Sequence, residues 1–494
     1  MNNWDLLILL PIIFVSSIFV IFFIIHKEKI KLKAGLFLGE IFIFWLGVAF
    51  IGYQLTNAAN TIIKSIDSMA YILIILFSSS LFAIFLKPLA TFFTGVIRKR
   101  KFWTILSYSI LIFISFVLIF VKLNQLTIGI ISLFYAILLS TSTIHNLILN
   151  EQFYYRVNTL PSTWICYTFI GLGSAFGVYI ANIQSVVFKS INFLDLDIIA
   201  LLIGLIVLLS TIFILKENKS LAGAFDKEVI IQLPKKNNWN FMLIYTLTLL
   251  LSLTYSISNS IITQTFLSLK FLEYGLSKEQ IETWLRTFNN AFIIPSLIIS
   301  YFIFKYLLKY FGQKYLFMMN LLVLFIMYTI LVFITNPYIF IFLNIFIGIT
   351  YTQLIYTLFS FCMFWNYRAP KNPVTGFFGS ALFLGKFIIE SIENILIKQK
   401  VSIFKDFYKI WDINNNDQLT AIKNQYFDVL SILFSVCVAL TLIIALIYYY
   451  SSNKLIADFI NYRLATQNLK GILKRRVIEK TKTQINVEDL KVKV

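Results

Sequence analysis

Three charged residues stand inside an otherwise apolar segment, GSALFLGKFIIESIENIL, which covers residues 379–396. Lys386 and Glu390 are four residues apart, so on a helix they share one face, and Glu393 follows one turn later on nearly the same face. A charge in hydrocarbon is costly unless it meets water or a partner, which makes these residues candidates for chemistry. Either Lys386 offers its charge to an anionic solute, with Glu390 as resting partner or proton acceptor, or the two only pair inside the protein. Glu393 is expected to reach the membrane surface.

Two further ionisable side chains interrupt apolar segments. Glu40 is the carboxylate of AGLFLGEIFIFWLG, and His145 lies in STSTIHNLILNEQF. A carboxylate and an imidazole can both take up and release a proton, so we predict Glu40 and His145 as proton-coupling residues. The alternative for each is a hydrogen bond to a neighbouring helix. Lys87 is a third candidate of this kind, near the end of its segment.

Neutral polar side chains gather in the segment SLTYSISNSIITQTF. We predict that Tyr255, Asn259 and Gln264 join Lys386 and Glu390 as substrate-binding residues. Such groups can equally hold helices together by hydrogen bonds. Glycines cluster in GLGSAFG and GFFGSALFLG, where they either let helices slide in a rocking transporter or only allow close packing.

Several other chemistries have no support in the sequence. Its three cysteines, Cys166, Cys362 and Cys437, all fall in or beside apolar segments, and the only two histidines are His26 and His145. There is no phosphate-binding loop, HExxH motif or indication of a Ser-His-Asp triad. We therefore expect no catalytic residue, no metal and no cofactor. The pair Asp195 and Asp197 leaves one alternative open, a membrane enzyme of the lipid-linked glycosyltransferase type.

The elements that must position these residues are membrane helices. The chain has 494 residues, of which 59% are hydrophobic and 13% charged, and this composition predicts an all-α polytopic protein in a lipid bilayer. Runs of about 20 apolar residues, each long enough to cross the hydrocarbon layer, occur thirteen times. They cover residues 5–26, 34–54, 69–93, 102–122, 126–149, 162–182, 196–216, 240–264, 288–308, 315–335, 337–361, 374–397 and 428–450.

Basic residues indicate the orientation of these spans. If the chain alternates from an outside N-terminus, 29 Lys and Arg fall on inside segments and 11 on outside segments. This bias predicts a cell-membrane protein with its N-terminus outside and its C-terminus in the cytoplasm. The net charge of +19 is accounted for in the same way, so we expect no nucleic-acid partner.

The spans after the first divide into six and six. We predict an extra N-terminal helix and basic loop (1–33), a six-helix bundle (34–216), a cytoplasmic linker (217–239), a second six-helix bundle (240–450) and a basic cytoplasmic tail (451–494). Two such bundles with substrate between them are the architecture of one transporter class.

Two short basic turns strengthen the match to that class. KYLLKYFGQKYLF has Gly312 and Lys314, and PLATFFTGVIRKRKF has Gly95 and the basic cluster that begins at Arg98. Both resemble the G-x-L-x-D-R-x-G-R-[RK] turn of the major facilitator superfamily, at equivalent places in the two halves. Neither keeps the acidic residue, which is Phe92 in the first half and Lys309 in the second.

The resemblance implies a secondary transporter. It would move a small polar or anionic organic solute by alternating access, with coupling to protons as a further expectation, and we expect it to be a monomer. The four turn residues would then take part in conformational change. The alternatives are the membrane enzyme above and a scaffold or sensor of the same fold that transports nothing.

Overall fold

A computed structural model describes residues 4–63, 69–97, 99–121, 124–154, 159–186, 195–217, 238–365, 374–400, 402–404 and 416–492. Apart from a short 3₁₀ turn at Ser402–Phe404, the regular elements of this part of the chain are α- and π-helices. They are η1 (Asp5–Leu9), α1 (Leu10–Lys27), α2 (Leu32–Ile63), α3 (Met69–Ile97), α4 (Arg100–Phe120), α5 (Gln125–Ile148), η2 (Leu149–Phe153), α6 (Thr159–Val186), α7 (Leu196–Phe213), α9 (Asn238–Ser258), α10 (Ile261–Glu273), α11 (Lys278–Phe333), α12 (Pro337–Trp365), α13 (Val374–Lys398) and α14 (Asn416–Val492).

The prediction of an all-α membrane protein is confirmed. Every predicted run falls on helix, with 240–264 divided between α9 and α10, and with 288–308 and 315–335 both on the bent α11. Among the described residues, ten helical stretches are long and apolar enough to cross a membrane. Helices suit these sequences because hydrocarbon offers no partner to backbone N–H and C=O groups, so each segment must satisfy its own.

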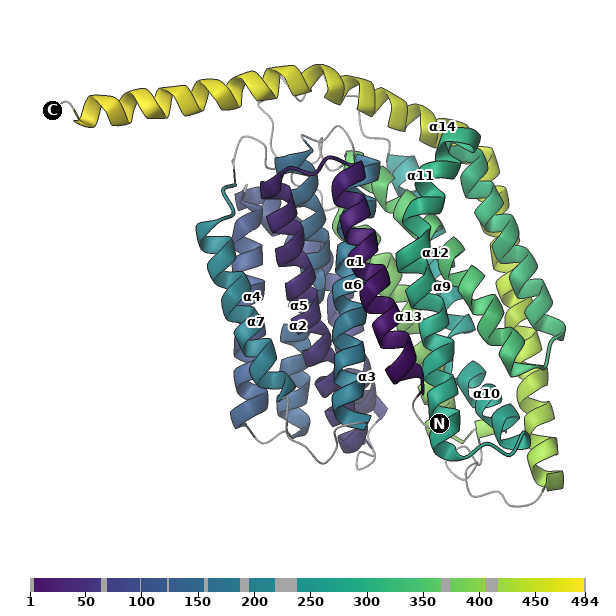
Figure 1. Cartoon of the computed structure of the whole chain (residues 1–494). Helices are drawn as coiled ribbons and strands as arrows, with labels where there is room; N and C mark the ends of the chain where they lie inside the picture. The colour runs from purple at the N-terminus through teal and green to yellow at the C-terminus, as the bar shows by residue number, and fades with distance from the viewer. Residues whose placement is uncertain are drawn as a thin grey trace.

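The helices form two groups, with α2 to α7 in one and α9 to α14 in the other (Figure 1). We refer to these groups as the first half and the second half. Two seams join them: α3 packs against α13, and α6 packs against α11 and α12. We use the name linker side for the end of the bundle where α7 ends and α9 begins. The division of the chain at residues 217–239 stays a prediction, because residues 218–237 lie outside the described residues.

Helix α1 crosses obliquely over the region between the two halves (Figure 1). It contacts α6 of the first half and α11 of the second. Ion pairs join the segments that flank it to α11: Arg286 Nε lies 2.9 Å from Asp5 Oδ2 of η1, and Lys305 pairs with Glu28, which follows the end of α1. The extra helix therefore belongs to the packed structure, with polar contacts to the second half.

Helix α14 continues far beyond its apolar stretch. It bends at the linker side and runs across that end of the molecule to Val492 (Figure 1). This extension carries the basic tail predicted for residues 451–494, which is helical as far as Val492.

Candidate functional site

The charged face of α13 points into the protein. The Lys386 ammonium lies 3.5 Å from Glu390 Oε1, and the two side chains are 48% and 31% exposed. Apolar exposed residues take the other face: at about 100° per residue, Phe377 lies opposite Lys386 and Ile392 lies nearly opposite Glu390. The face suited to lipid is thus turned away from the ion pair. The pair is accessible to solvent on the side that α13 turns toward the interior.

Tyr255 stands beside this pair. Helix α9 packs closely on α13, where the Ser252 hydroxyl donates to the Leu382 carbonyl oxygen over 2.6 Å. One turn along α9, the Tyr255 ring stacks on Tyr351 with centroids 4.9 Å apart. Tyr255 also interacts electrostatically with Lys386 and Glu390. Three of the predicted substrate-binding residues are therefore close to one another.

Asn259 and Gln264 lie at the break between α9 and α10. The Asn259 amide donates to the Tyr255 carbonyl oxygen over 3.2 Å, and the Gln264 amide donates to the Asn259 carbonyl oxygen over 3.4 Å. The Gln264 side chain thus satisfies a carbonyl group that the interrupted helix leaves open, whereas the Tyr255 carbonyl oxygen also accepts from the Asn259 backbone N–H over 3.1 Å. Such irregular backbone inside a membrane is tolerated where it is buried in protein or lines a wet space.

The prediction that Glu393 reaches the membrane surface is wrong. Its side chain is buried, with 4% exposure, and accepts hydrogen bonds from the backbone N–H groups of Ile261 and Ile262 at 3.3 and 3.4 Å. These are the first amides of α10, and a helix that starts within the membrane has no water to satisfy them. The positive end of the α10 dipole also stabilises a carboxylate at this position.

The seam between α3 and α13 is closed near the linker side. The Ser380 hydroxyl donates to the Ile84 carbonyl oxygen across it. Gly376 and Gly379 let the two backbones meet, because a Cβ on Gly376 would lie 2.6 Å from Pro88 Cα and one on Gly379 would lie 2.5 Å from Lys87 Cδ.

Aromatic rings close the other seam on the same side. The Trp164 ring of α6 stacks on Phe304 of α11, with centroids 4.4 Å apart, and meets Tyr356 of α12 edge-on at 4.9 Å. Tyr167, one turn further along α6, stacks on Tyr356 at 5.2 Å. Both seams are therefore shut at the linker side in this conformation.

Glu40 and His145 are joined through a third residue, Tyr108. The Tyr108 hydroxyl lies 3.0 Å from Glu40 Oε1 and 2.8 Å from His145 Nε2. Glu40 also accepts hydrogen bonds from the hydroxyls of Ser210 and Thr211. These residues come from α2, α4, α5 and α7, so the network lies inside the first half and outside the two seams.

The hydrogen-bond directions in this network follow from Trp45. Its indole N–H can only donate, and it lies 3.2 Å from His145 Nδ1, which must therefore accept. A neutral His145 then carries its proton on Nε2 and donates to Tyr108, whose hydroxyl proton is left for Glu40. The result is a continuous chain of donors from Trp45 to Glu40.

Comparison with known proteins gives similarity at the level of structure. Neither a protein-family model nor a curated protein matches the sequence. A bacterial homolog of the human lysosomal transporter Spinster, in an inward-facing and occupied conformation, superposes with a TM-score of 0.52 over 88% of this chain and 98% of its own, at 12% identity. The chain has the major facilitator fold.

Two further solved structures share the fold. The human organic anion transporter MFSD10 matches with a TM-score of 0.53 at 11% identity, over 83% of this chain and all of its own. The E. coli fucose:proton symporter FucP matches with a TM-score of 0.50 at 15% identity, over 83% of this chain and 97% of its own. At such identities the likeness concerns the fold, and the subfamily stays open.

The basic turn of the second half contains a bend in α11 at Gly312. Gly312 has φ of +70°, a left-handed conformation that favours glycine, and it divides α11 into two helical segments. The Lys314 ammonium lies 3.0 Å from Asn453 Oδ1 of α14. In the first half, Gly95 is buried in the last turn of α3, while Arg98 lies outside the described residues.

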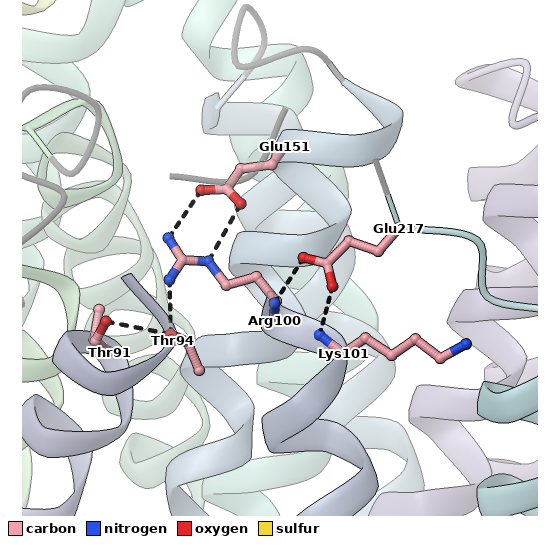
Figure 2. Close-up of polar contacts among 6 residues, drawn as sticks. All are labelled: Thr91, Thr94, Arg100, Lys101, Glu151 and Glu217. Carbon is pink, nitrogen blue, oxygen red and sulfur yellow. Dashed lines mark hydrogen bonds and ion pairs between the residues drawn. The ribbon is translucent and has the colours of Figure 1, made fainter. Parts of the chain in front are cut away.

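Arg100 is the residue of the first-half basic cluster that organises this turn (Figure 2). Its guanidinium contacts both oxygens of Glu151 at 3.3 Å and donates to the Thr94 hydroxyl over 2.7 Å. The Glu217 carboxylate accepts from the backbone N–H groups of Arg100 and Lys101 at 2.6 and 2.8 Å, at the start of α4. Although the turn lacks its own acidic residue, two distant carboxylates reach it.

Glu217 gives this cluster a pH dependence. Burial raises the pKa of Glu217 above its ordinary value of 4.5, and the two backbone donors offset this only in part. The folded state therefore binds this proton more tightly than the unfolded state, so the contribution to stability is present below pH 4.5 and is lost as pH rises through the raised pKa. We expect Glu217→Gln to flatten that decline, as measured by unfolding midpoints between pH 4 and 8. An identical pH profile for both proteins would contradict the assignment.

Asp195 has a structural position. It is the N-cap of α7, where its carboxylate accepts from the backbone N–H of Asp197 over 3.1 Å. Among the described residues, no group of three or more His, Cys, Asp or Glu side chains could hold a metal ion.

Sequence reasoning missed several residues of these networks, among them Tyr108, Glu151 and Glu217. Tyr108 sits in an apolar segment where its hydroxyl gives no signal of its own. The two glutamates lie at helix ends near the linker side, where charged residues are ordinary. Only their pairing with Arg100 and the α4 amides distinguishes them.

Proposed function

We propose that the protein is a secondary transporter that moves a small polar or anionic organic solute by alternating access. The observation that carries this proposal is the Lys386–Glu390 pair, which is partly exposed on an inward-turned helix face while both seams are shut at the linker side. Tyr255 beside the pair offers an aromatic face and a hydroxyl to the same solute. Support also comes from the fold, which is shared with an organic anion transporter and a fucose:proton symporter.

Proton coupling is the second part of the proposal. Glu40 and His145 are the candidate carriers, and Tyr108 connects them by hydrogen bonds. Because the three residues lie inside the first half, a proton there would act by changing how α2, α4, α5 and α7 pack. We place the linker side in the cytoplasm, as the distribution of basic residues predicts.

The test is flux through vesicles that contain the purified full chain. A panel of labelled organic acids and sugars is offered with and without a proton gradient. For an accepted anion, we expect Lys386→Met to lower flux about tenfold, which corresponds to roughly 1.4 kcal/mol of lost charge interaction. Lys33→Met, an exposed lysine near the start of α2, is the matched control and should leave flux unchanged.

Proton coupling is read from the same vesicles. Glu40→Gln is expected to abolish the dependence of flux on the proton gradient. Absence of flux for the whole panel would remove the transport proposal, whereas gradient-independent flux in the native protein would remove only the coupling.

A further inference from the structure

Lys87 is a buried cation whose hydrogen-bond partners are all neutral. It lies on α3 with 4% exposure, and its ammonium donates to the Leu139 carbonyl oxygen and to the Ser142 hydroxyl, both over 2.9 Å. The Phe383 ring covers another side of the ammonium, and its centroid lies 5.2 Å from Lys87 Nζ. In the part of the chain that the structure describes, no carboxylate forms an ion pair with Lys87. The ammonium is satisfied as a donor, but its charge has no counter-charge.

The partners of Lys87 belong to different halves. Leu139 and Ser142 are on α5, in the same half as α3, whereas Phe383 is on α13 across the seam. If this seam parts during alternating access, the two oxygen partners stay with Lys87 and the ring moves away. One side of a buried ammonium is then uncovered, facing the space that opens.

Unpartnered polar groups lie next to that position. Ser142, Thr143 and Asn146 share one face of α5, with Asn146 one turn, about 6 Å, from Ser142 toward the linker side. Asn146 is fully buried, and neither its amide nitrogen nor its amide oxygen has a hydrogen-bond partner. The buried Thr143 hydroxyl has none either. Buried polar groups without partners are uncommon and require an explanation.

A contrast with Lys386 indicates what this position is suited to bind. Lys386 has Glu390 at 3.5 Å, so its charge is already compensated. The ammonium of Lys87, the Asn146 amide and the Thr143 hydroxyl are donors that an oxyanion could accept from, and the uncompensated charge favours an anion over a neutral solute.

We propose that Lys87 binds the oxyanion group, carboxylate or phosphate, of the transported solute when the α3–α13 seam opens, and that the Phe383 ring covers the same ammonium when the seam is shut. The proposal rests on the alternating-access function given above. It adds Lys87 as a second cationic contact for the anionic group, beside Lys386 of the site described above.

Binding can be tested without knowing the solute. The purified full chain carries Gly376→Ala, which opposes closure of the seam, and is examined with Lys87→Met or Lys33→Met added. Sodium succinate and sodium phosphate are the probes, with sodium chloride at equal ionic strength as reference. We expect at least one oxyanion to raise the unfolding midpoint by about 2 °C over chloride. Lys87→Met should abolish this rise, and the exposed control Lys33→Met should retain it.

The same measurements are repeated in a second variant, in case Gly376→Ala prevents correct folding. Phe383→Leu removes the ring and keeps the glycine contacts, and the same ordering of midpoints is expected. A rise with succinate alone or phosphate alone supports the site and identifies the anionic group. A rise that survives Lys87→Met, or no rise with either anion in both backgrounds, overturns the proposal. If the anion binds in a Lys87-dependent way but no solute crosses the vesicle membrane, the result counts against the proposed transport function and leaves the binding site standing.

Discussion

Replacement of Gly376 by alanine is expected to keep the protein from closing at the linker side and to lower flux sharply. The new Cβ would meet the Lys87 carbonyl oxygen and would lie 2.6 Å from Pro88 Cα. Both atoms are backbone, so no side-chain rotation can relieve the overlap, and α3 must move away from α13. Overpacking of this kind costs roughly 2 kcal/mol, which reduces the ratio of closed to open protein about thirtyfold.

Closure can be followed through a thiol at the seam. Ser380 is buried there and bonds to the Ile84 carbonyl oxygen, so Ser380→Cys, in a chain whose three native cysteines are replaced, reports opening by its alkylation rate. We expect Gly376→Ala to raise the rate by about the same thirtyfold factor.

The matched control is Gly129→Ala in α5. A Cβ at Gly129 would meet nothing within 4 Å, so this change should leave both alkylation and flux at the native level. Slow alkylation in Gly376→Ala together with native flux would show that the glycine contact is not needed for closure.

The sequence predicts the helices well because membrane helices are specified locally. Each segment needs length and apolar composition, and its backbone bonds are internal. The order of helices and the position of Gly312 follow from the same local information, since a left-handed residue between two apolar runs favours glycine.

The neighbours that each side chain contacts could not be predicted in this way. The depth of Glu393 along its helix predicts a position at the membrane surface. Its partner, however, is the start of α10, and α10 begins there only because α9 breaks at Asn259. In the same way, Arg100 and Glu151 are 51 residues apart, and their pairing depends on how α4 and α5 pack. Contacts between distant segments carry the candidate site, and a single sequence does not report them.

The Arg100–Glu151 pair leads to the second large prediction, which concerns stability. Both side chains are 2% exposed, so removal of either one takes away the buried ion-pair partner of the other. Loss of one member of a buried pair costs about 3–5 kcal/mol. We expect Arg100→Met and Glu151→Leu each to lower the free energy of unfolding by that amount, measured by denaturant titration in micelles.

The double variant separates pairing from packing. With both charges gone, no uncompensated charge is left, so Arg100→Met combined with Glu151→Leu should be more stable than either single variant. If the losses instead add, the residues act independently and the ion pair does not organise the turn. An exposed carboxylate supplies the comparison: Glu273 is 38% exposed and lies 2.8 Å from Lys270 and 2.7 Å from Lys423. Glu273→Gln should cost no more than about 1 kcal/mol, because water can replace the lost partner.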